Sequence, residues 1–201
     1  MKIAILSQIA VNEAVLVIKK EGVVVFPTDT VYGFLADATN KKAVEKIYKI
    51  KKRPRSKPLP VFVSSIKQAK KIAEIDQPAF AKGFGEARQE KILKKYWPGK
   101  FTFILKRKPG AKIFGIDKNT IALRIPKYKF LNDLLEKVNR PLVQTSVNIS
   151  GEPELNSIEE IINEFDRQKI KPDLIIDAGD LPKSKPSKII DLTSARLTRL
   201  R

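Results

Sequence analysis

Two short segments, far apart in the chain, carry residue types that could bind a phosphorylated substrate. The first reads KIKKRPRSK and spans residues 49–57, where six of nine side chains are cationic. The second, residues 146–148, reads SVN and offers a hydroxyl and an amide. Arginine supplies planar pairs of donors and lysine supplies point charges, so the first segment can neutralise much of a triphosphate. The alternative for this run is a solvated helix end, where cations favour unpaired carbonyls.

The residues that are missing limit the chemistry further. The chain has no cysteine and no histidine, which excludes thiolate nucleophiles, imidazole bases and the commonest zinc ligands. Any reaction must therefore use lysine, arginine, carboxylates, hydroxyls, backbone amides and groups of the substrate itself. Neither a P-loop nor a Gly-x-Gly-x-x-Gly motif occurs, so a nucleotide site would have to be built differently.

A third polar segment follows an apolar strand predicted at Val23 to Phe26. After Pro27 come Thr28, Asp29 and Thr30. In α/β folds the carboxyl ends of strands converge on a ligand crevice, which predicts a binding role for these side chains. The alternative is a polar turn in which Asp29 and the threonines bond their own backbone.

A helix predicted at 40–51 would position the basic run. Asn40 suits its N-cap, and Pro54 closes it. Ala43, Val44, Ile47 and Tyr48 have the spacing of one inward face. The run therefore emerges at the carboxyl end of this helix.

Strands and helices alternate along the rest of the chain. Further helices are predicted at 11–20, 66–74, within 78–95, and after the capping box formed by Ser157 and Glu160. Several late strands lack intervening helices, which favours an α/β fold with a mixed sheet in one domain, residues 1–201. Strands are predicted at 60–63, 101–105, 120–124, 142–145, 174–177, 187–192 and 197–200.

Charge and polarity indicate the partners and the compartment. The net charge of +18 predicts a polyanionic partner, although a lysine-rich proteome would give the same excess. Polar residues interrupt the apolar N-terminal segment, which argues against a signal peptide or a membrane span. We therefore expect a cytoplasmic protein whose formal sequon at residues 148–150 is not glycosylated.

Six ordered landmarks resemble the YrdC/TsaC family of threonylcarbamoyl-AMP synthases. Leu197-Thr198-Arg199 then resembles the closing arginine segment of that family. The resemblance implies one YrdC-like domain, with a twisted, open mixed sheet around a concave basic cavity. The landmarks are PTDTVYG at 27–33, KKRP at 51–54, YWPGKFTFIL at 96–105, IALRIP at 121–126, TSVNISGEP at 145–153 and KPSKIIDLT at 185–193.

The activity implied by this resemblance is nucleotidyl transfer. L-Threonine, bicarbonate and ATP would condense to threonylcarbamoyl-adenylate and pyrophosphate, and transferase proteins would pass the product to tRNA as threonylcarbamoyladenosine. Mg²⁺ would be held mainly by the ATP phosphates, with no protein ligand. The resemblance implies that ATP is held by Arg53, Lys57, Thr120, Ser146, Asn148 and Arg199, and threonine by Thr30, Arg124, Gln144 and Ser187.

Within that set, the resemblance makes Lys51 and Arg53 the catalytic cations and gives the threonine carboxylate to Arg124. Phe62 is a departure, because many relatives have a histidine at that position, and a hydrogen bond from it to threonine is not expected here. Tyr96, Trp97 and Phe101 are interpreted as core and cavity-wall residues, with base stacking as the alternative.

Three alternatives remain open. The chain could be a non-catalytic module that grips tRNA or double-stranded RNA through phosphates. It could carry out the same adenylation with carbamoyl phosphate as the substrate, as in the hydrogenase-maturation relatives of the family. Individual residues could also be structural, with Arg124 facing solvent, Ser146 and Asn148 forming a turn, Ser187 at a strand edge and Arg199 in a frayed end. Dependence on threonine separates the synthase from the RNA-binding module.

Overall fold

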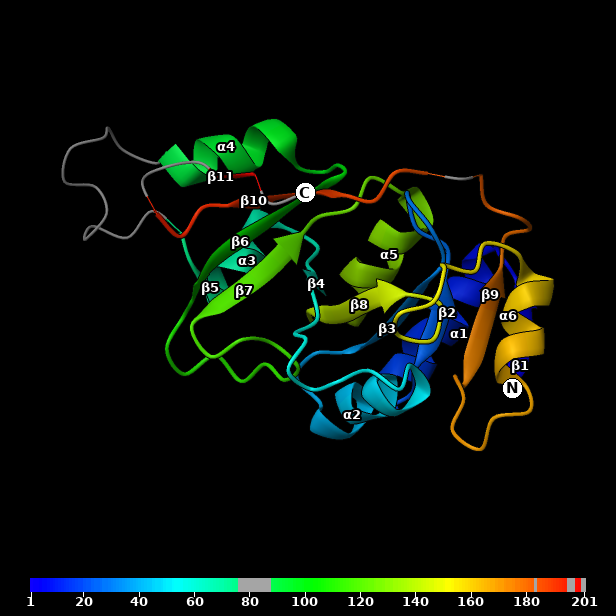
Figure 1. Ribbon diagram of the computed structural model, residues 1–201. Helices are drawn as coiled ribbons and strands as arrows, with labels where there is room; N and C mark the ends of the chain where they lie inside the picture. Colours follow the sequence, from blue (N-terminus) through cyan, green and yellow to red (C-terminus); the bar gives the residue numbers. More distant parts are fainter. Residues whose placement is uncertain (76–87, 183, 195–197, 200–201) are drawn as a thin grey trace.

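One mixed β-sheet organises the protein. The computed structural model describes residues 1–75, 88–182, 184–194 and 198–199 (Figure 1). The strand order is β1-β9-β2-β3-β8-β4-β7-β6-β10-β11, and β5 pairs with β6 beside this path. The strands are β1 Lys2–Ile5, β2 Val24–Phe26, β3 Gly33–Asp37, β4 Val61–Phe62, β5 Ala73–Glu74, β6 Phe101–Arg107, β7 Thr120–Arg124, β8 Leu142–Ser146, β9 Leu174–Asp177, β10 Lys188–Asp191 and β11 Thr198–Arg199.

The pairing directions confirm the predicted mixed sheet. β9 runs parallel to both β1 and β2, β4 runs parallel to β7, and β6 runs parallel to β10. The central pairs of β3 with β8, β8 with β4 and β6 with β7 are antiparallel. Antiparallel neighbours need no crossover helix, which is why β7 follows β6 without one.

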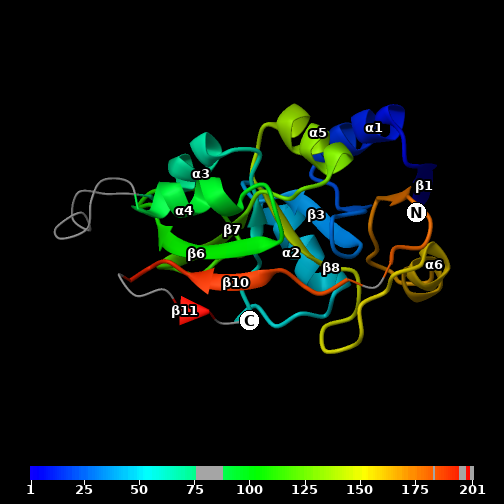
Figure 2. The same ribbon diagram turned by 90° about the horizontal axis from the view of Figure 1, so that it is seen from above.

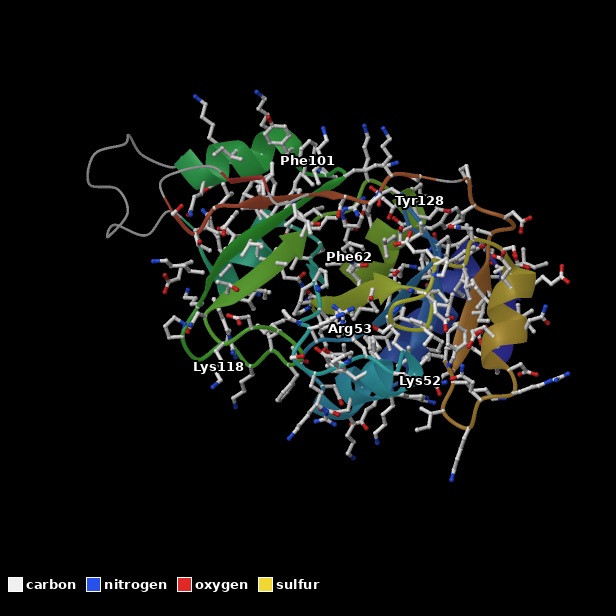
Figure 3. All side chains as sticks on the ribbon, viewed as in Figure 1. Lys52, Arg53, Phe62, Phe101, Lys118 and Tyr128 are labelled. Atoms are coloured by element: carbon white, nitrogen blue, oxygen red, sulfur yellow. The ribbon has the colours of Figure 1, made fainter. Side chains whose placement is uncertain are left out.

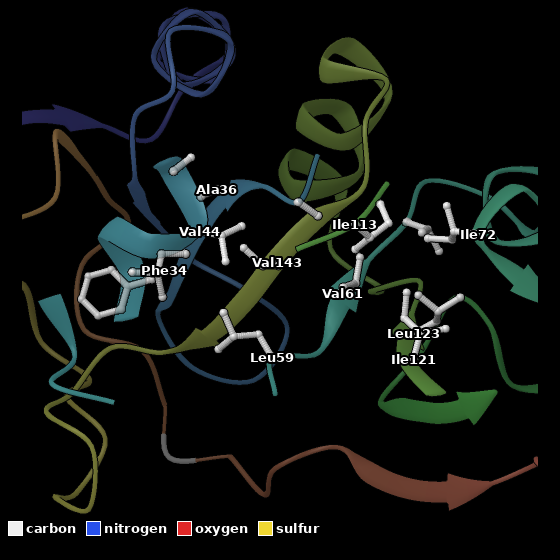
Figure 4. Packing of buried hydrophobic residues seen from close by; sticks show 14 of the residues in the cluster. Phe34, Ala36, Val44, Leu59, Val61, Ile72, Ile113, Ile121, Leu123 and Val143 are labelled. Carbon is white, nitrogen blue, oxygen red and sulfur yellow. The ribbon is translucent and has the colours of Figure 1, made fainter. Parts of the chain in front are cut away.

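In the described part of the chain, the helices that cover the sheet are α1 Gln8–Lys19, α2 Lys41–Ile50, α3 Ile66–Ile72, α4 Arg88–Tyr96, α5 Lys129–Val138 and α6 Ile158–Phe165. Successive strand residues point to opposite faces, so Val24 and Phe26 join the core beneath α1 and α5, whereas Val25 joins the larger core beneath the other helices. Figure 2 shows α1 and α5 together on one side of the strands and α6 on the other. Figure 4 shows the larger core, in which Phe34, Val44, Leu59 and Val143 gather.

The predicted elements are largely confirmed, with informative differences. β7 and β9 have the predicted bounds, and Asn40 caps α2 through a bond from the Ala43 amide to its Oδ1 at 3.0 Å. The helix predicted at 66–74 ends at Ile72, because the next two residues pair with β6 instead. The part of the helix predicted within 78–95 that precedes residue 88 lies outside the described residues. No helix among the described residues has the length and apolarity needed to cross a membrane.

At the carboxyl end of α2, neighbouring residues of the basic run point in different directions. Lys52 has a left-handed backbone, with a φ of 50°, so the chain turns sharply after Lys51. The turn is closed by a bond from the Arg53 amide to the Tyr48 carbonyl at 3.0 Å. As a result Lys51 is buried. Lys52 is exposed and Arg53 is half-buried (Figure 3). Three neighbouring cations thus meet three different environments.

Candidate active site

A cavity of about 390 Å³ lies over the middle of the sheet. Alternate residues of its strands face the cavity, namely Thr102 and Ile104 of β6, Ala122 and Arg124 of β7, and Gln144 and Ser146 of β8. Seven residues predicted from the sequence line it: Thr30, Arg53, Thr120, Arg124, Gln144, Ser146 and Ser187.

Lys51 lies beneath this cavity rather than in its lining. Its side chain is 1% exposed, and its Nζ donates to the carbonyls of Ser146 and Asn148 at 2.6 and 2.9 Å and to Asn148 Oδ1 at 2.7 Å. The Ser146 hydroxyl donates to the same Oδ1 at 2.8 Å. Burial lowers the pKa of Lys51 to about 7, and the positive charge of Arg53 adds to that effect. Lys51 therefore connects the basic run at residues 49–57 to the segment at residues 146–148 through these hydrogen bonds.

Asn148 is buried within the same network. Its Nδ2 donates to the carbonyls of Ile149 and Glu152 at 2.9 and 2.7 Å. All polar atoms of the side chain are therefore bonded, and Asn148 does not line the cavity. The arrangement fixes the turn after β8, which presents Ser146 to the cavity. The prediction that Asn148 holds ATP directly stays untested.

Arg53 faces the cavity and also shapes its wall. Its Nε and Nη2 donate to the carbonyls of Lys57 and Pro58, both at 3.0 Å. Pro58, which lines the cavity, is thereby held by the same guanidinium that offers charge to a ligand. Burial lowers the pKa of Arg53, but from a value so high that the side chain stays cationic.

Arg124 is almost fully buried at the cavity floor. Its Nε donates to the Gly99 carbonyl at 2.9 Å, and its Nη2 lies 2.6 Å from Asp29 Oδ1. The pKa of Arg124 is lowered by burial, which the neighbouring Asp29 charge opposes. The Phe62 ring, 1% exposed, lies beneath the guanidinium at 5.8 Å from Cζ. Phe62 thus supports Arg124 by a cation–π contact.

Several of the remaining lining residues carry hydroxyls with fixed partners. Thr102 Oγ1 and Ser187 Oγ lie 2.9 Å apart. Thr28 Oγ1 lies 3.0 Å from Thr30 Oγ1 and donates to the Val31 carbonyl, so the polar segment after β2 is indeed a turn that also borders the cavity. Thr120 Oγ1 donates to Asp117 Oδ1 at 3.2 Å. Backbone hydrogen bonds, chiefly from the Asn119 and Thr120 amides, lower the pKa of Asp117.

Two predicted ATP ligands whose side chains are described, Lys57 and Asn148, are not in the lining, and several polar lining residues were not predicted. Lys57 is exposed and contributes its carbonyl to Arg53. The backbone of Arg199 lies in β11, but its side chain falls outside the described part. Sequence reasoning missed Thr102, Asp117 and Glu154, which line the cavity. Strand alternation could have found Thr102, whereas nothing local marks the other two.

The aromatic residues near α4 belong to the core. Trp97 is 6% exposed, packs edge-on against Phe103 and donates its Nε1–H to the Phe101 carbonyl at 2.8 Å. Tyr96 and Phe101 have ring centroids 4.5 Å apart. Tyr96, Trp97 and Phe101 are absent from the cavity lining, so their core role is confirmed and their cavity-wall role is wrong.

The charge of the lining fits an anionic ligand better than a metal ion held by the protein. Among the described residues, no group of three or more acidic, histidine or cysteine side chains could hold a metal. Two arginines and several hydroxyls instead face the cavity together with the carboxylates of Asp117 and Glu154. Such donors suit phosphate and carboxylate groups.

Comparison with known proteins agrees with this geometry. The Sua5/YciO/YrdC family model, described as "Telomere recombination", matches residues 16–201. A protein of Methanocaldococcus jannaschii is 36% identical over 179 residues, which are 89% of this chain and 78% of that protein. The threonylcarbamoyl-AMP synthase of Psychromonas ingrahamii is 28% identical over 197 residues, 97% of this chain and 98% of its own.

Solved structures extend the similarity to three dimensions. Pyrococcus abyssi Sua5, solved in complex with L-threonine, superposes with a TM-score of 0.81 and 31% identity. The superposition covers 100% of this chain but only 56% of Sua5, so this chain spans little more than half of that relative. With the family match over nearly all residues, these findings show that the chain belongs to the Sua5/YciO/YrdC family.

Proposed function

We propose that this protein is a threonylcarbamoyl-AMP synthase, a nucleotidyltransferase that joins L-threonine, bicarbonate and ATP. The observation that carries the proposal is the placement of Arg124, Arg53 and Ser146 around one cavity. One arginine can take a carboxylate and the other a phosphate, so the cavity can hold an amino acid beside a nucleotide. The synthase of P. ingrahamii, which this chain matches along its length, supports the same activity.

The reaction suits a site that lacks histidine. The threonine amine attacks the carbon of bicarbonate, or of CO₂ derived from it, and water is lost overall. A carbamate oxygen then attacks the α-phosphorus of ATP, and pyrophosphate leaves. No protein nucleophile is required, so the protein contributes by positioning the reactants and by stabilising charge on the transferring phosphoryl group.

The lining divides into two parts for the two larger substrates. Arg124, with Thr30, Gln144 and Ser187, would hold threonine, and Arg124 would take its carboxylate. Arg53 and Ser146, with Thr120, would hold ATP. The nucleotide would enter as its Mg²⁺ complex, in which phosphates and water complete the metal shell. The mixed anhydride formed is reactive, and transferase proteins would consume it to modify tRNA.

The test is an isotope-trapping assay with the purified protein, ATP, Mg²⁺ and labelled bicarbonate. We expect pyrophosphate and labelled adenylate to form only when L-threonine is present. Serine and carbamoyl phosphate, each replacing threonine, serve as controls for the amino acid and for the carbamoyl donor. Pyrophosphate release at the same rate with and without threonine, or release that requires carbamoyl phosphate, would refute the assignment.

A second function, RNA binding, is favoured by a separate basic surface. Lys41, Lys42, Lys46, Lys49 and Arg55 surround a concavity along α2, outside the synthase cavity. Lys46 pairs with Asp173 at 2.5 Å and Arg55 pairs with Glu45, but no ionic partner of Lys41 or Lys49 is found in the described residues. Cations in excess of their partners attract a phosphate backbone.

The RNA surface predicts that the affinity for tRNA falls steeply with salt. Replacing Lys41 and Lys49 together by alanine should reduce the slope of log affinity against log salt by roughly 2, because each phosphate contact contributes about 0.9. Filter binding at several salt concentrations measures that slope. Replacing Lys137, on α5 and away from this surface, by alanine is the control. Equal slopes for all three proteins would exclude this surface as the RNA site.

A further inference from the structure

The Arg124 guanidinium is held by groups from two distant segments. Gly99 accepts the Nε–H through its carbonyl at 2.9 Å, and the Asp29 carboxylate forms an ion pair with Nη2 at 2.6 Å. Both side chains of the ion pair are buried, at 2% exposure for Arg124 and 7% for Asp29. The contact is a close ion pair without the angle of an aligned hydrogen bond.

Asp29 is itself fixed from the far side. Its Oδ2 accepts the backbone N–H of Lys127 at 3.1 Å, just beyond the end of β7, where Arg124 lies. The two carboxylate oxygens therefore have different partners: Oδ2 accepts from the Lys127 amide, and Oδ1 pairs with Arg124. The loop after β2 is thus pinned to the carboxyl end of β7.

The Gly99 carbonyl is fixed in the same way. The Gly99 amide donates to the Ile125 carbonyl at 2.9 Å, which ties this turn to the residue next to Arg124. A Cβ added at position 99 would lie 2.6 Å from the Tyr96 carbonyl oxygen, which is backbone and cannot turn aside. The carbonyl that orients Arg124 therefore depends on glycine at this position.

These contacts determine which donors remain for a ligand. A guanidinium has five N–H groups in one plane, on Nε, Nη1 and Nη2. Nε–H is taken by the Gly99 carbonyl, and the buried Nη2 lies against Asp29. Because Arg124 lines the cavity, Nη1 is the nitrogen left to donate to a substrate.

The Asp29 charge has two opposing effects on a bound carboxylate. It offsets part of the attraction that Arg124 exerts, which would weaken binding. It also holds a long, buried side chain in one rotamer, so that a ligand need not order the side chain on arrival. The backbone contacts at Lys127 and Gly99 hold Asp29 and Arg124 in one orientation. We therefore expect the gain from an ordered Arg124 side chain to exceed the loss of attraction for the carboxylate.

We propose that Asp29 and Gly99 are positioning residues, which hold the Arg124 guanidinium so that Nη1 is aimed at the carboxylate of the amino-acid substrate. The inference rests on the proposed function, because it takes Arg124 as the threonine carboxylate ligand. Neither residue need touch threonine, so both act through Arg124.

Asp29→Asn and Gly99→Ala test the proposal. Asparagine has one acceptor oxygen in place of two, so it must give up either Arg124 or the Lys127 amide. We expect KM for threonine to rise roughly tenfold or more in each variant, since small misplacements of a binding group cost that much. KM for ATP should stay within about twofold of wild type. Asp133→Asn, which removes an exposed carboxylate paired with Lys129, is the matched control.

Calorimetric binding of threonine without ATP separates this inference from the proposed function, because it needs no turnover. Weaker threonine binding in both variants, with unchanged melting temperature, supports positioning. Unchanged or tighter binding in folded Asp29→Asn protein would overturn it. If Asp29→Asn unfolds because Arg124 loses its counter-charge, Gly99→Ala decides, since it keeps both charges paired. A wild-type protein that binds threonine but makes no adenylate would refute only the synthase assignment.

Discussion

Replacing Arg53 by alanine should lower kcat/KM for ATP by roughly 100-fold or more, the range found when a preorganised donor to a developing charge is removed. The structure gives two reasons. The guanidinium faces the cavity, so its loss removes a cation from the proposed phosphate site. It also holds the carbonyls of Lys57 and Pro58, so the wall beside the nucleotide loses its support. Pyrophosphate release at varied ATP concentrations, with threonine saturating, measures the effect.

Two further variants separate charge from geometry. Arg53→Lys keeps the cation but lacks the planar fork that reaches two carbonyls, so we expect activity between that of wild type and the alanine variant. Lys52→Ala is the matched control, because Lys52 is adjacent, cationic and exposed (Figure 3). We expect this variant to have wild-type turnover. Thermal unfolding shows whether the fold is intact. Wild-type turnover by a folded Arg53→Ala protein would remove Arg53 from the active site.

The basic run shows what could and could not be predicted from the sequence. Residue types and helix spacing placed it at the end of α2, and the structure agrees. The different directions of Lys51, Lys52 and Arg53 were not predictable, because they depend on the φ of 50° at Lys52. That conformation is uncommon for a non-glycine residue, and no pattern of residue types announces it here.

The central strand β3 was missed for a related reason. Its sequence, GFLAD, has neither the polar–apolar alternation of a half-buried strand nor the run of β-branched residues by which the equally buried β2 was predicted. By contrast, β7 alternates and was predicted with its full bounds. The Asp29–Arg124 pair was equally invisible, because it joins residues 95 positions apart whose partners are chosen by sheet pairing. The residue types and the local elements could be predicted from the sequence, whereas contacts between residues far apart in the chain could not.

Lys51→Met should destabilise the protein by at least about 2 kcal/mol at pH 7, because buried acceptors left without donors cost about 1–3 kcal/mol each. The carbonyls of Ser146 and Asn148 lose the Lys51 donor, whereas Asn148 Oδ1 keeps the Ser146 hydroxyl. Removing a buried ammonium recovers part of that loss, since its desolvation no longer opposes folding. Urea unfolding of both proteins gives the difference. Lys49→Met, two residues away and exposed, is the control and should match wild type.

The difference between wild type and Lys51→Met should also change with pH in one direction. Burial lowers the pKa of Lys51 to about 7 in the folded protein, from 10.5 in an unperturbed lysine. Between these values the unfolded chain holds a proton at Lys51 that the folded chain has released. The stability contributed by Lys51 therefore rises with pH above about 7, by at most about 1.4 kcal/mol per pH unit. Below pH 7 both states are protonated, and the contribution stays at its minimum.

This pH dependence discriminates between two descriptions of Lys51. A neutral amine donates only two hydrogens to the three acceptors around it, so the network favours the ammonium, whereas burial disfavours it. If burial prevails, the stability difference grows between pH 7 and 9. If it stays flat, the three acceptors keep Lys51 charged throughout that range. A flat difference would leave Lys51 as a permanent cation beneath the Ser146 turn, adding its field to that of Arg53 at the proposed phosphate site.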